Sequence, residues 1–355
     1  MSYRIASFNM YNFSLRSDLV IKKNLDTIAR IIKDNNIDLV AMQEVLAAGR
    51  PVMGIQSNKN AQNKLPYEKS LLYRLGKDWE SYWGNPETRS KYYPYLGNDS
   101  RSEGYAFLWN SKKFELLKDE NGDPIWPKIY RNYHVPSGQL RLIRDPLYGR
   151  FKIRGTKTEL RLITTHIIYG KPKDENIKTE YTVDDGAISL RRNEFNILAG
   201  NIYSRISDYR KDVNNTDPYT IILGDYNLNL QSSDVKSATI PDVAYFNAKG
   251  QLDSGGALSV RKIYTCQSQK SSLGEKAYAN NYDHFSFDDN VLRLLKHRKE
   301  IYGIHFDEHV LKIVDGVHDY AISEDELEEE KFARFKKEVS DHVPIILEID
   351  LKKRY

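Results

Sequence analysis

Acidic, amide and imidazole side chains stand at the ends of several apolar segments of the sequence. These residues are of types that bind metal ions or phosphate groups: Asn9, Glu44, His166, Asp225 with Asn227, and Asp341 with His342. Asp283 is of the same kind but lies inside a further apolar segment. A charged group buried at the end of a strand without a partner is costly. One such residue is ordinary, whereas several together indicate a shared site where strands converge.

Two of the motifs suit metal or phosphate binding, although each has an ordinary structural explanation. Glu44 follows Ala41-Met42-Gln43, and a carboxylate there suits Mg²⁺, which prefers oxygen ligands. Taken alone, Glu44 is better explained as a cap. Asp225 and Asn227 lie two residues apart after Gly224, so in an extended segment they point the same way and can address one phosphate. An Asx turn explains this motif about equally well.

Ser340-Asp341-His342-Val343-Pro344 places a histidine beside a carboxylate, a combination suited to general base catalysis. Adjacent side chains on a strand face opposite ways, so both reach one site only in a bent loop. A surface turn is favoured for this motif taken alone. His166 closes Ile163-Thr164-Thr165, and Asp283 lies in Asn281-Tyr282-Asp283-His284; as isolated residues both are more often structural.

Short strands and a few helices are expected to position these residues. Leu25, Ile28, Ile31 and Ile32 have helical spacing and predict an amphipathic helix over residues 19–36. Further helices are expected over 188–206, near 67–75 and within 324–339, and strands over 4–9, 38–42, 105–109, 160–165, 219–223, 282–287 and 343–351. This order predicts a four-layer α/β sandwich, in which two mainly antiparallel sheets pack face to face and are flanked by helices.

Composition restricts the class of protein. No repeat or linker divides the 355 residues, which predicts one domain over 1–355 with insertions near 46–102 and 288–339. The net charge of +4 permits a polyanionic partner without requiring one. The single cysteine, Cys266, excludes an internal disulfide and favours a cytoplasmic location. No segment is apolar enough to predict a membrane partner, and no obligate protein partner is evident.

The ordered set of motifs resembles the endonuclease/exonuclease/phosphatase superfamily, and deoxyribonuclease I in particular. The matching segments span most of the chain: Ser7-Phe8-Asn9, 38–44, 103–108, Thr165-His166, 224–227, Tyr282-Asp283 and Ser340-Asp341-His342. The resemblance implies the four-layer sandwich and a divalent metal, usually Mg²⁺ with Mn²⁺ as an alternative. It implies that Glu44 is the principal metal ligand, that Asn9 lies beside it, and that Asp341 holds the same or a second ion.

The resemblance also implies catalytic roles. His342, oriented by Asp283, acts as general base or contacts the phosphate, and Glu103 with His166 forms a second pair that protonates the leaving oxygen. Which histidine is base and which is acid stays open. It further implies that Asp225 and Asn227 position the attacking water and the phosphoryl oxygens. It also implies that Arg150 contacts the phosphate backbone, although Arg150 is a weaker match because no proline follows it.

The resulting hypothesis is a DNA endonuclease that leaves 5′-phosphate and 3′-hydroxyl ends. The Glu103–His166 pair favours DNA, as do basic stretches at Lys22-Lys23, Lys59–Lys64, Arg89–Lys91 and Lys171–Lys173. One alternative is a phosphatase or phosphodiesterase acting on a lipid head group or an inositol phosphate. A second alternative is an inactive binding module on the same fold, which the chemically competent motif residues argue against.

Overall fold

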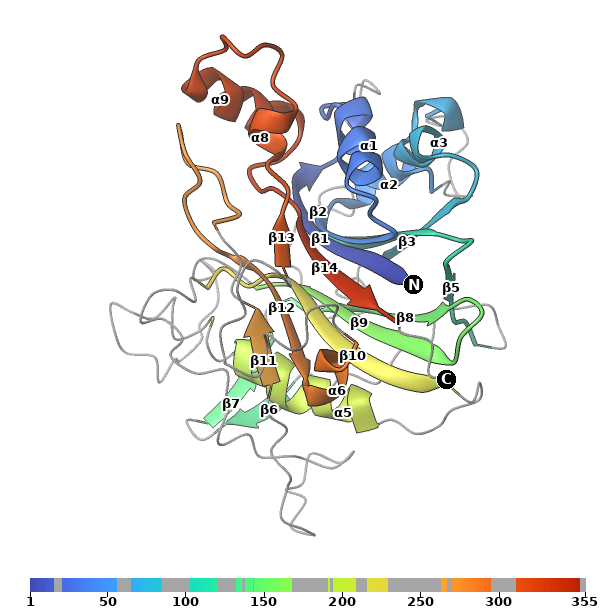
Figure 1. Ribbon diagram of the computed structural model, residues 1–355. Helices are drawn as coiled ribbons and strands as arrows, with labels where there is room; N and C mark the ends of the chain where they lie inside the picture. Colours follow the sequence, from blue (N-terminus) through green and yellow to red (C-terminus); the bar gives the residue numbers. More distant parts are fainter. Residues whose placement is uncertain are drawn as a thin grey trace.

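The fold is seen in a computed structural model of the chain (Figure 1). The structure describes residues 1–15, 21–55, 65–84, 103–119, 132–135, 138–142, 144–167, 191, 194–208, 216–228, 263–266, 270–294 and 311–351. The basic stretches at 59–64, 89–91 and 171–173 lie outside these ranges, as do parts of the two expected insertions.

The first sheet has six strands, and its central pair is parallel. In spatial order the strands are β13 (Leu311–Ile313), β14 (Ile345–Asp350), β1 (Ser2–Phe13), β2 (Leu39–Val45), β4 (Tyr105–Asn110) and β3 (Trp79–Gly84). Strands β1 and β2 run parallel, and the other neighbours are antiparallel.

The second sheet repeats this plan. Its order is β11 (Ile263–Cys266), β12 (Asp283–Asp288), β10 (Asp217–Asp225), β9 (Thr158–His166), β8 (Leu147–Ile153) and β5 (Phe114–Leu116). Only β9 and β10 run parallel among its neighbouring pairs. A separate hairpin joins β6 (Asn132–Val135) to β7 (Gly138–Arg141).

Helices cover the outer faces of the two sheets, so the four expected layers are confirmed (Figure 1). The first sheet carries α1 (Leu25–Asp34), η1 (Ala47–Gly49), α2 (Arg50–Met53), η3 (Tyr67–Lys69), α3 (Leu71–Leu75), α8 (Gly316–Asp319) and α9 (Glu328–Glu338). The second carries η6 (Ile197–Ile202) and α5 (Tyr203–Asp208), and α6 (Asp289–Leu292) follows β12. In the described part of the chain, no helix is long and apolar enough to cross a membrane.

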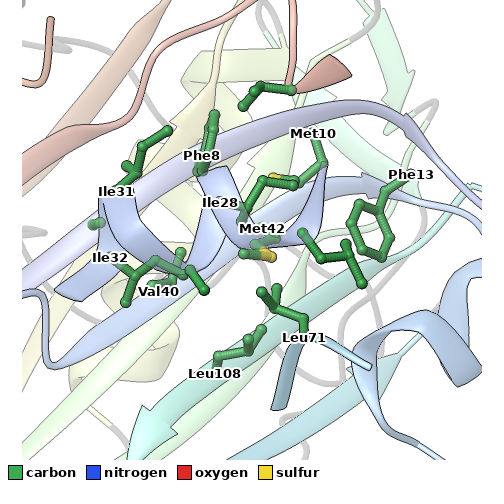
Figure 2. Close-up of a cluster of buried hydrophobic side chains, with 14 of the residues drawn as sticks. Phe8, Met10, Phe13, Ile28, Ile31, Ile32, Val40, Met42, Leu71 and Leu108 are labelled. Carbon is green, nitrogen blue, oxygen red and sulfur yellow. The ribbon is translucent and has the colours of Figure 1, made fainter. Parts of the chain in front are cut away.

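Alternation of side chains along the strands separates three apolar layers. Phe8, Val40 and Met42 face the helices of the first sheet, where Figure 2 shows them with Ile28 and Ile31 of α1. The layer between the sheets contains apolar side chains from both, among them Ile5, Leu39, Phe107, Leu162, Leu223, Phe285 and Leu347. A third layer lies between the second sheet and η6–α5 and includes Ile163, Ile222, Ile197 and Ile202.

The expected helices form with shifted boundaries. Helix α1 begins at Leu25, later than predicted, because Asn24 is its N-cap: Asn24 Oδ1 accepts a hydrogen bond of 3.1 Å from the Thr27 amide. Helix α9 has acidic residues in its first turn and basic residues in its last, as its sequence predicts. The helix expected over 188–206 appears, where described, as the π-helical η6 followed by α5.

The insertion expected near 46–102 contains regular secondary structure where it is described. It contributes α2, α3 and the edge strand β3, which pairs with β4 from Trp79 to Gly84. The region after Asp288 likewise contributes α6, β13, α8 and α9. The helices α3 and α9 were expected from the sequence, whereas the strands β3 and β13 form through pairing with β4 and β14, which overrides weak local propensity.

Candidate active site

The candidate site lies at one end of the layer between the sheets, where apolar side chains give way to polar ones. Along β9, Leu160 and Leu162 face this layer, and alternation then turns Thr164 and His166 to the same side. The same rule brings Asp225 into line with Leu223 on β10, and Asp283 into line with Phe285 on β12. Because β9 and β10 end there while the antiparallel β12 begins there, these side chains meet.

Asp225 is the centre of the cluster and is almost fully buried, with 1% of its surface exposed. Its Oδ2 accepts a hydrogen bond of 2.9 Å from Asn9 Nδ2. The same oxygen lies 3.7 Å from His166 Nε2 and 3.6 Å from His342 Nε2, so it stands between two imidazoles. Burial raises the pKa of Asp225 to about 6, although the charges of His342 and His166 oppose that rise.

His342 is held by a carboxylate behind it. Its Nδ1 lies 2.6 Å from Asp283 Oδ2, and the same oxygen accepts a hydrogen bond of 2.6 Å from the Ser271 hydroxyl. Burial works to lower the pKa of His342, but the charges of Asp283 and Asp225 outweigh burial and raise the pKa to about 10. His342 is therefore an imidazolium at neutral pH, with Nε2 directed toward Asp225.

His166 has a matching carboxylate on the other side of Asp225. Its Nδ1 lies 2.5 Å from Glu103 Oε1. Burial and the charge of Arg144 lower the pKa of His166, but the charges of Glu103 and Asp225 outweigh them, and the net shift is upward. The two histidines thus face one buried carboxylate, each with an acidic partner.

Arg144 completes the second pair and was missed by the sequence reasoning. Its Nη2 forms an ion pair of 2.8 Å with Glu103 Oε2, and its Nη1 lies 2.8 Å from His166 Nδ1. Because Nδ1 of a protonated His166 donates to Glu103, Arg144 acts mainly through that carboxylate. Pro146, two residues after Arg144, was the available signal, since the proline expected after the family's arginine is absent after Arg150.

Arg150 is not part of the site, and its predicted phosphate contact is wrong. On β8 it shares a face with Tyr148, on the helix side of the second sheet. Its guanidinium is 1% exposed and binds Glu159 through Nε at 2.6 Å and Nη2 at 2.8 Å. Alternation along β8 places Arg150 on the face opposite to His166, so the guanidinium cannot reach a phosphate there.

Glu44 reaches the cluster through a left-handed turn of the backbone, with φ at 56°. Without this turn, alternation would place it with Val40 and Met42 on the helix side. Glu44 Oε1 accepts a hydrogen bond of 3.1 Å from Asn9 Nδ2, and Oε2 accepts one of 3.0 Å from the Asn12 amide. A non-glycine residue in this conformation is strained, and such strain clusters at functional sites.

Asp341 is the second carboxylate beside Asn9 and Glu44. Burial raises its pKa, and the charge of Glu44 adds to the effect against the opposing charges of His342 and Lys23. Its Oδ1 is buried and, among the described residues, has no hydrogen-bond partner. Such an orphaned oxygen fits a bound cation. Within the described ranges, no group of three or more His, Cys, Asp or Glu is placed to hold a metal.

Asn227 supports the cluster from the loop after β10, where its φ is 50°. Its amide N–H donates to Asp225 Oδ1 at 2.8 Å, and its Nδ2 donates to the Ile167 carbonyl at 2.7 Å. Asn227 therefore fixes Asp225 and ties together the ends of β9 and β10. Of the predicted site residues, the structure brings nine together and leaves only Arg150 apart: Asn9, Glu44, Glu103, His166, Asp225, Asn227, Asp283, Asp341 and His342.

Comparisons with known proteins agree with this architecture. Two bacterial endonuclease/exonuclease/phosphatase proteins have the same fold. The protein from Bacteroides thetaiotaomicron has 12% sequence identity and a TM-score of 0.51, and the match covers 100% of this chain and 97% of that chain. The protein from Bacteroides vulgatus has 14% identity and a TM-score of 0.51, with 99% of this chain and 100% of that chain covered. A truncated TDP2 from Caenorhabditis elegans is a weaker match, with 12% identity, a TM-score of 0.48, and 99% of this chain and 98% of that chain covered. No curated protein matches significantly.

A family model provides the assignment, because it matches nearly the whole length of the chain and includes every residue of the cluster. The match extends over residues 6–342 and is to the Endonuclease/Exonuclease/phosphatase family. Members of this family hydrolyse phosphodiesters or phosphate esters. The chain belongs to the Endonuclease/Exonuclease/phosphatase family.

Proposed function

We propose that the chain is a divalent-metal-dependent phosphodiesterase that cleaves DNA and leaves 5′-phosphate and 3′-hydroxyl ends. The observation that carries this proposal is the placement of two histidine–carboxylate pairs, His342–Asp283 and His166–Glu103, on either side of Asp225. Hydrolysis of a phosphodiester requires activation of water and protonation of a poor leaving group, the alkoxide. Two separate acid–base groups around one carboxylate supply both functions.

Glu44 and Asp341 are the residues that would hold a divalent ion, with Asn9 fixing Glu44. Mg²⁺ is usually bound in proteins by one or two carboxylates and keeps several waters, which suits two acidic donors and the orphaned Asp341 Oδ1. Mn²⁺ accepts the same oxygen ligands. When bound, the ion supplies positive charge that neutralises the non-bridging oxygens of the phosphate.

The pKa shifts of these groups support a division of roles among the side chains. Asp225, with its pKa near 6, is ionised at neutral pH and orients and deprotonates the attacking water. His342 is already protonated, so it donates a hydrogen bond from Nε2 to a phosphoryl oxygen instead of acting as the base. His166 carries the proton that passes to the leaving oxygen, and Glu103 holds its Nδ1 in place.

Plasmid nicking tests the function. Purified protein with Mg²⁺ should convert supercoiled plasmid to nicked circles, and EDTA should stop the reaction. Nicks that DNA ligase seals directly have 5′-phosphate and 3′-hydroxyl ends. Glu44→Gln should lower nicking at least about a hundredfold, because a metal ligand is lost, whereas Glu80→Gln on the exposed edge of β3 should nick at the normal rate.

The same protein should be offered phosphoinositide vesicles and inositol phosphates. Release of phosphate or a head group from these, without nicking of DNA, would show that the protein hydrolyses phosphoesters but that DNA is the wrong substrate. Nicking by Glu44→Gln at the normal rate would instead refute the metal-ligand assignment.

Removal of Arg144 should lower kcat and shift the pH dependence of kcat, because both depend on His166. We expect Arg144→Leu to lower kcat about ten- to a hundredfold, the size of one lost charge-assisted hydrogen bond. Arg144 lowers the pKa of His166, so its loss raises that pKa further, and the decline of kcat at high pH should move to higher pH. The kcat–pH profile checks this, with Arg154→Leu as a control because Arg154 pairs with the exposed Glu115. An unchanged profile would argue against a role through His166.

A further inference from the structure

Two of the basic residues expected to contact DNA are buried in the structure. Arg150 binds Glu159 in the interior, and Lys23 is only 8% exposed. Arg50, which the sequence reasoning did not select, is half-buried and keeps part of its surface in solvent. It stands at the start of α2, in the segment that follows Glu44. Arg50 is therefore an accessible cation close to a predicted metal ligand in sequence.

The guanidinium of Arg50 is fixed in place by two contacts. Its Nε donates a hydrogen bond of 3.1 Å to the Ala47 carbonyl. Its Cζ lies 4.9 Å from the centroid of the Trp83 ring, a contact that favours the planar, weakly hydrated guanidinium. Within the described part of the chain, Nη1 and Nη2 form no hydrogen bond or ion pair. Two donor nitrogens are thus held ready for a ligand that the chain does not itself supply.

The ring of Trp83 links Arg50 to the end of the first sheet. Trp83 Nε1 donates a hydrogen bond of 2.8 Å to the Val45 carbonyl, which also accepts one of 3.1 Å from the Gly104 amide. A Cβ at residue 104 would stand 2.8 Å from Trp83 Cζ2, so glycine is required where the ring crosses β4. Each of these two backbone partners directly follows an acidic residue of the site, Glu44 or Glu103.

Arg50 and Trp83 lie on the helix side of this sheet end. Trp83 packs against the apolar cluster that contains Ile28 of α1, whereas Asp225 stands at the end of the layer between the two sheets, between His166 and His342. The guanidinium is therefore beside the catalytic cluster and not within it. A phosphate that binds there is a different group from the one that faces the histidines.

We propose that Arg50 binds a second phosphate of the substrate, beside the one that is cleaved. The inference rests on the proposed function and narrows it to substrates with more than one phosphate, for which a DNA strand is the expected source. A guanidinium binds two phosphate oxygens at once, and contacts of this kind position a nucleic acid without reading its sequence. Because Trp83 and Ala47 already hold the side chain, little conformational entropy is lost on binding.

Anisotropy of a fluorescent duplex oligonucleotide in EDTA, at several salt concentrations, measures this contact without cleavage. Arg50→Met keeps the apolar stem and should raise Kd about tenfold at low salt, the size of one lost charge-assisted contact. The slope of log Kd against log salt should fall by about 0.9, the share of one phosphate. Arg154→Met should match the wild type, because Arg154 also donates Nε to a carbonyl but lies at the end of β9 opposite to His166.

Two further variants separate the charge from its placement. Arg50→Lys keeps the charge but not the planar fork, so it should retain the wild-type slope with a raised Kd. Trp83→Leu removes no charge and should also raise Kd, because the guanidinium is no longer held. Thermal melts establish that each variant is folded, and Arg50→Lys keeps the test decisive if Trp83→Leu does not fold.

A substrate with a single phosphate tests which phosphate Arg50 binds. Arg50→Met should hydrolyse the p-nitrophenyl ester of thymidine 5′-phosphate with Mg²⁺ at the wild-type rate, while its kcat/KM on DNA falls about tenfold. Equal losses on both substrates would overturn the proposal, since Arg50 would then act on the cleaved phosphate. Wild-type Kd and slope for Arg50→Met would overturn it as well.

The source of the second phosphate and the proposed function fail separately. Loss of affinity of Arg50→Met for an inositol polyphosphate, but not for DNA, would support the second-phosphate site and refute DNA as its source. Binding of DNA that depends on Arg50, without nicking by the wild type, would support the site and refute the proposed function. Nicking by a protein whose DNA affinity does not depend on Arg50 would do the reverse. Failure of the wild type to bind either polyanion would overturn the proposal.

Discussion

Asp225→Asn is expected to lower kcat roughly 100- to 10,000-fold, the range for loss of a general base, with little change in KM. The substitution keeps the size of the side chain and the oxygen that faces Asn9. It removes the charge that both histidines share, so the water loses its base and the histidines lose a common partner. Steady-state kinetics on a DNA substrate with Mg²⁺ measures the two constants separately.

The pH profile gives a second measurement for the same variant. Activity of the wild-type protein should rise with pH through about 6 as Asp225 loses its proton, and this rise should be absent from Asp225→Asn. Asp217→Asn is the matched control, because Asp217 stands exposed at the far end of the same strand. A variant that retains more than a tenth of wild-type kcat would exclude Asp225 as the base.

Glu159→Gln is expected to lower the free energy of unfolding by about 3–5 kcal/mol, the usual result of breaking a buried ion pair. Glu159 is fully buried and accepts hydrogen bonds from Arg150, from Arg161 Nε at 2.8 Å and from the hydroxyl of Thr216. Glutamine would remove the negative charge that both buried guanidiniums bind. Urea unfolding at pH 7 measures the loss, and Glu115→Gln in the exposed pair with Arg154 should cost less than about 1 kcal/mol.

The acid stability of the wild-type protein should depend on the same carboxyl group. Burial opposes ionisation of Glu159, but the hydrogen bonds and charges around it outweigh burial and lower its pKa from 4.5 to about 2. Its contribution to stability is therefore present above pH 4.5 and lost as the pH falls toward 2. Between pH 4.5 and 2 the free energy of unfolding should fall less for Glu159→Gln than for the wild type. An equal fall with pH in both proteins would contradict the lowered pKa of Glu159.

The fold and most of the cluster were open to prediction because both follow from alternation along strands. His166, Asp225 and Asp283 continue the inward-facing positions of apolar strands, and their order along the chain matches the family. The same rule would have rejected Arg150, since Leu147, Phe151 and Ile153 occupy the inward positions of β8. Period-two patterning identifies the face on which a residue lies, and that face determines which residues can share a site.

Lys23 and Arg144 could not be found in this way, because their partners are distant in sequence. The charge of Lys23 acts on Glu44 and Asp341, and Arg144 binds Glu103. Pro146 was the one local signal for Arg144, and a lysine in a loop has no local pattern that distinguishes a buried ion partner from a solvated one. The left-handed turn at Glu44 is equally hidden, since no glycine marks it.

The pairing of β1 with β14 has a consequence for how the protein is made. These strands come first and last among those described, yet they are neighbours, and the segment leading into β14 carries Asp341 and His342. On the ribosome, one edge of β1 therefore stays open until β14 emerges, and an open edge is a site for chaperones or for misassembly. At that stage the nascent chain already carries Asn9, Glu44 and Asp225 but lacks His342, so the proposed site is completed only after the segment leading into β14 has been translated.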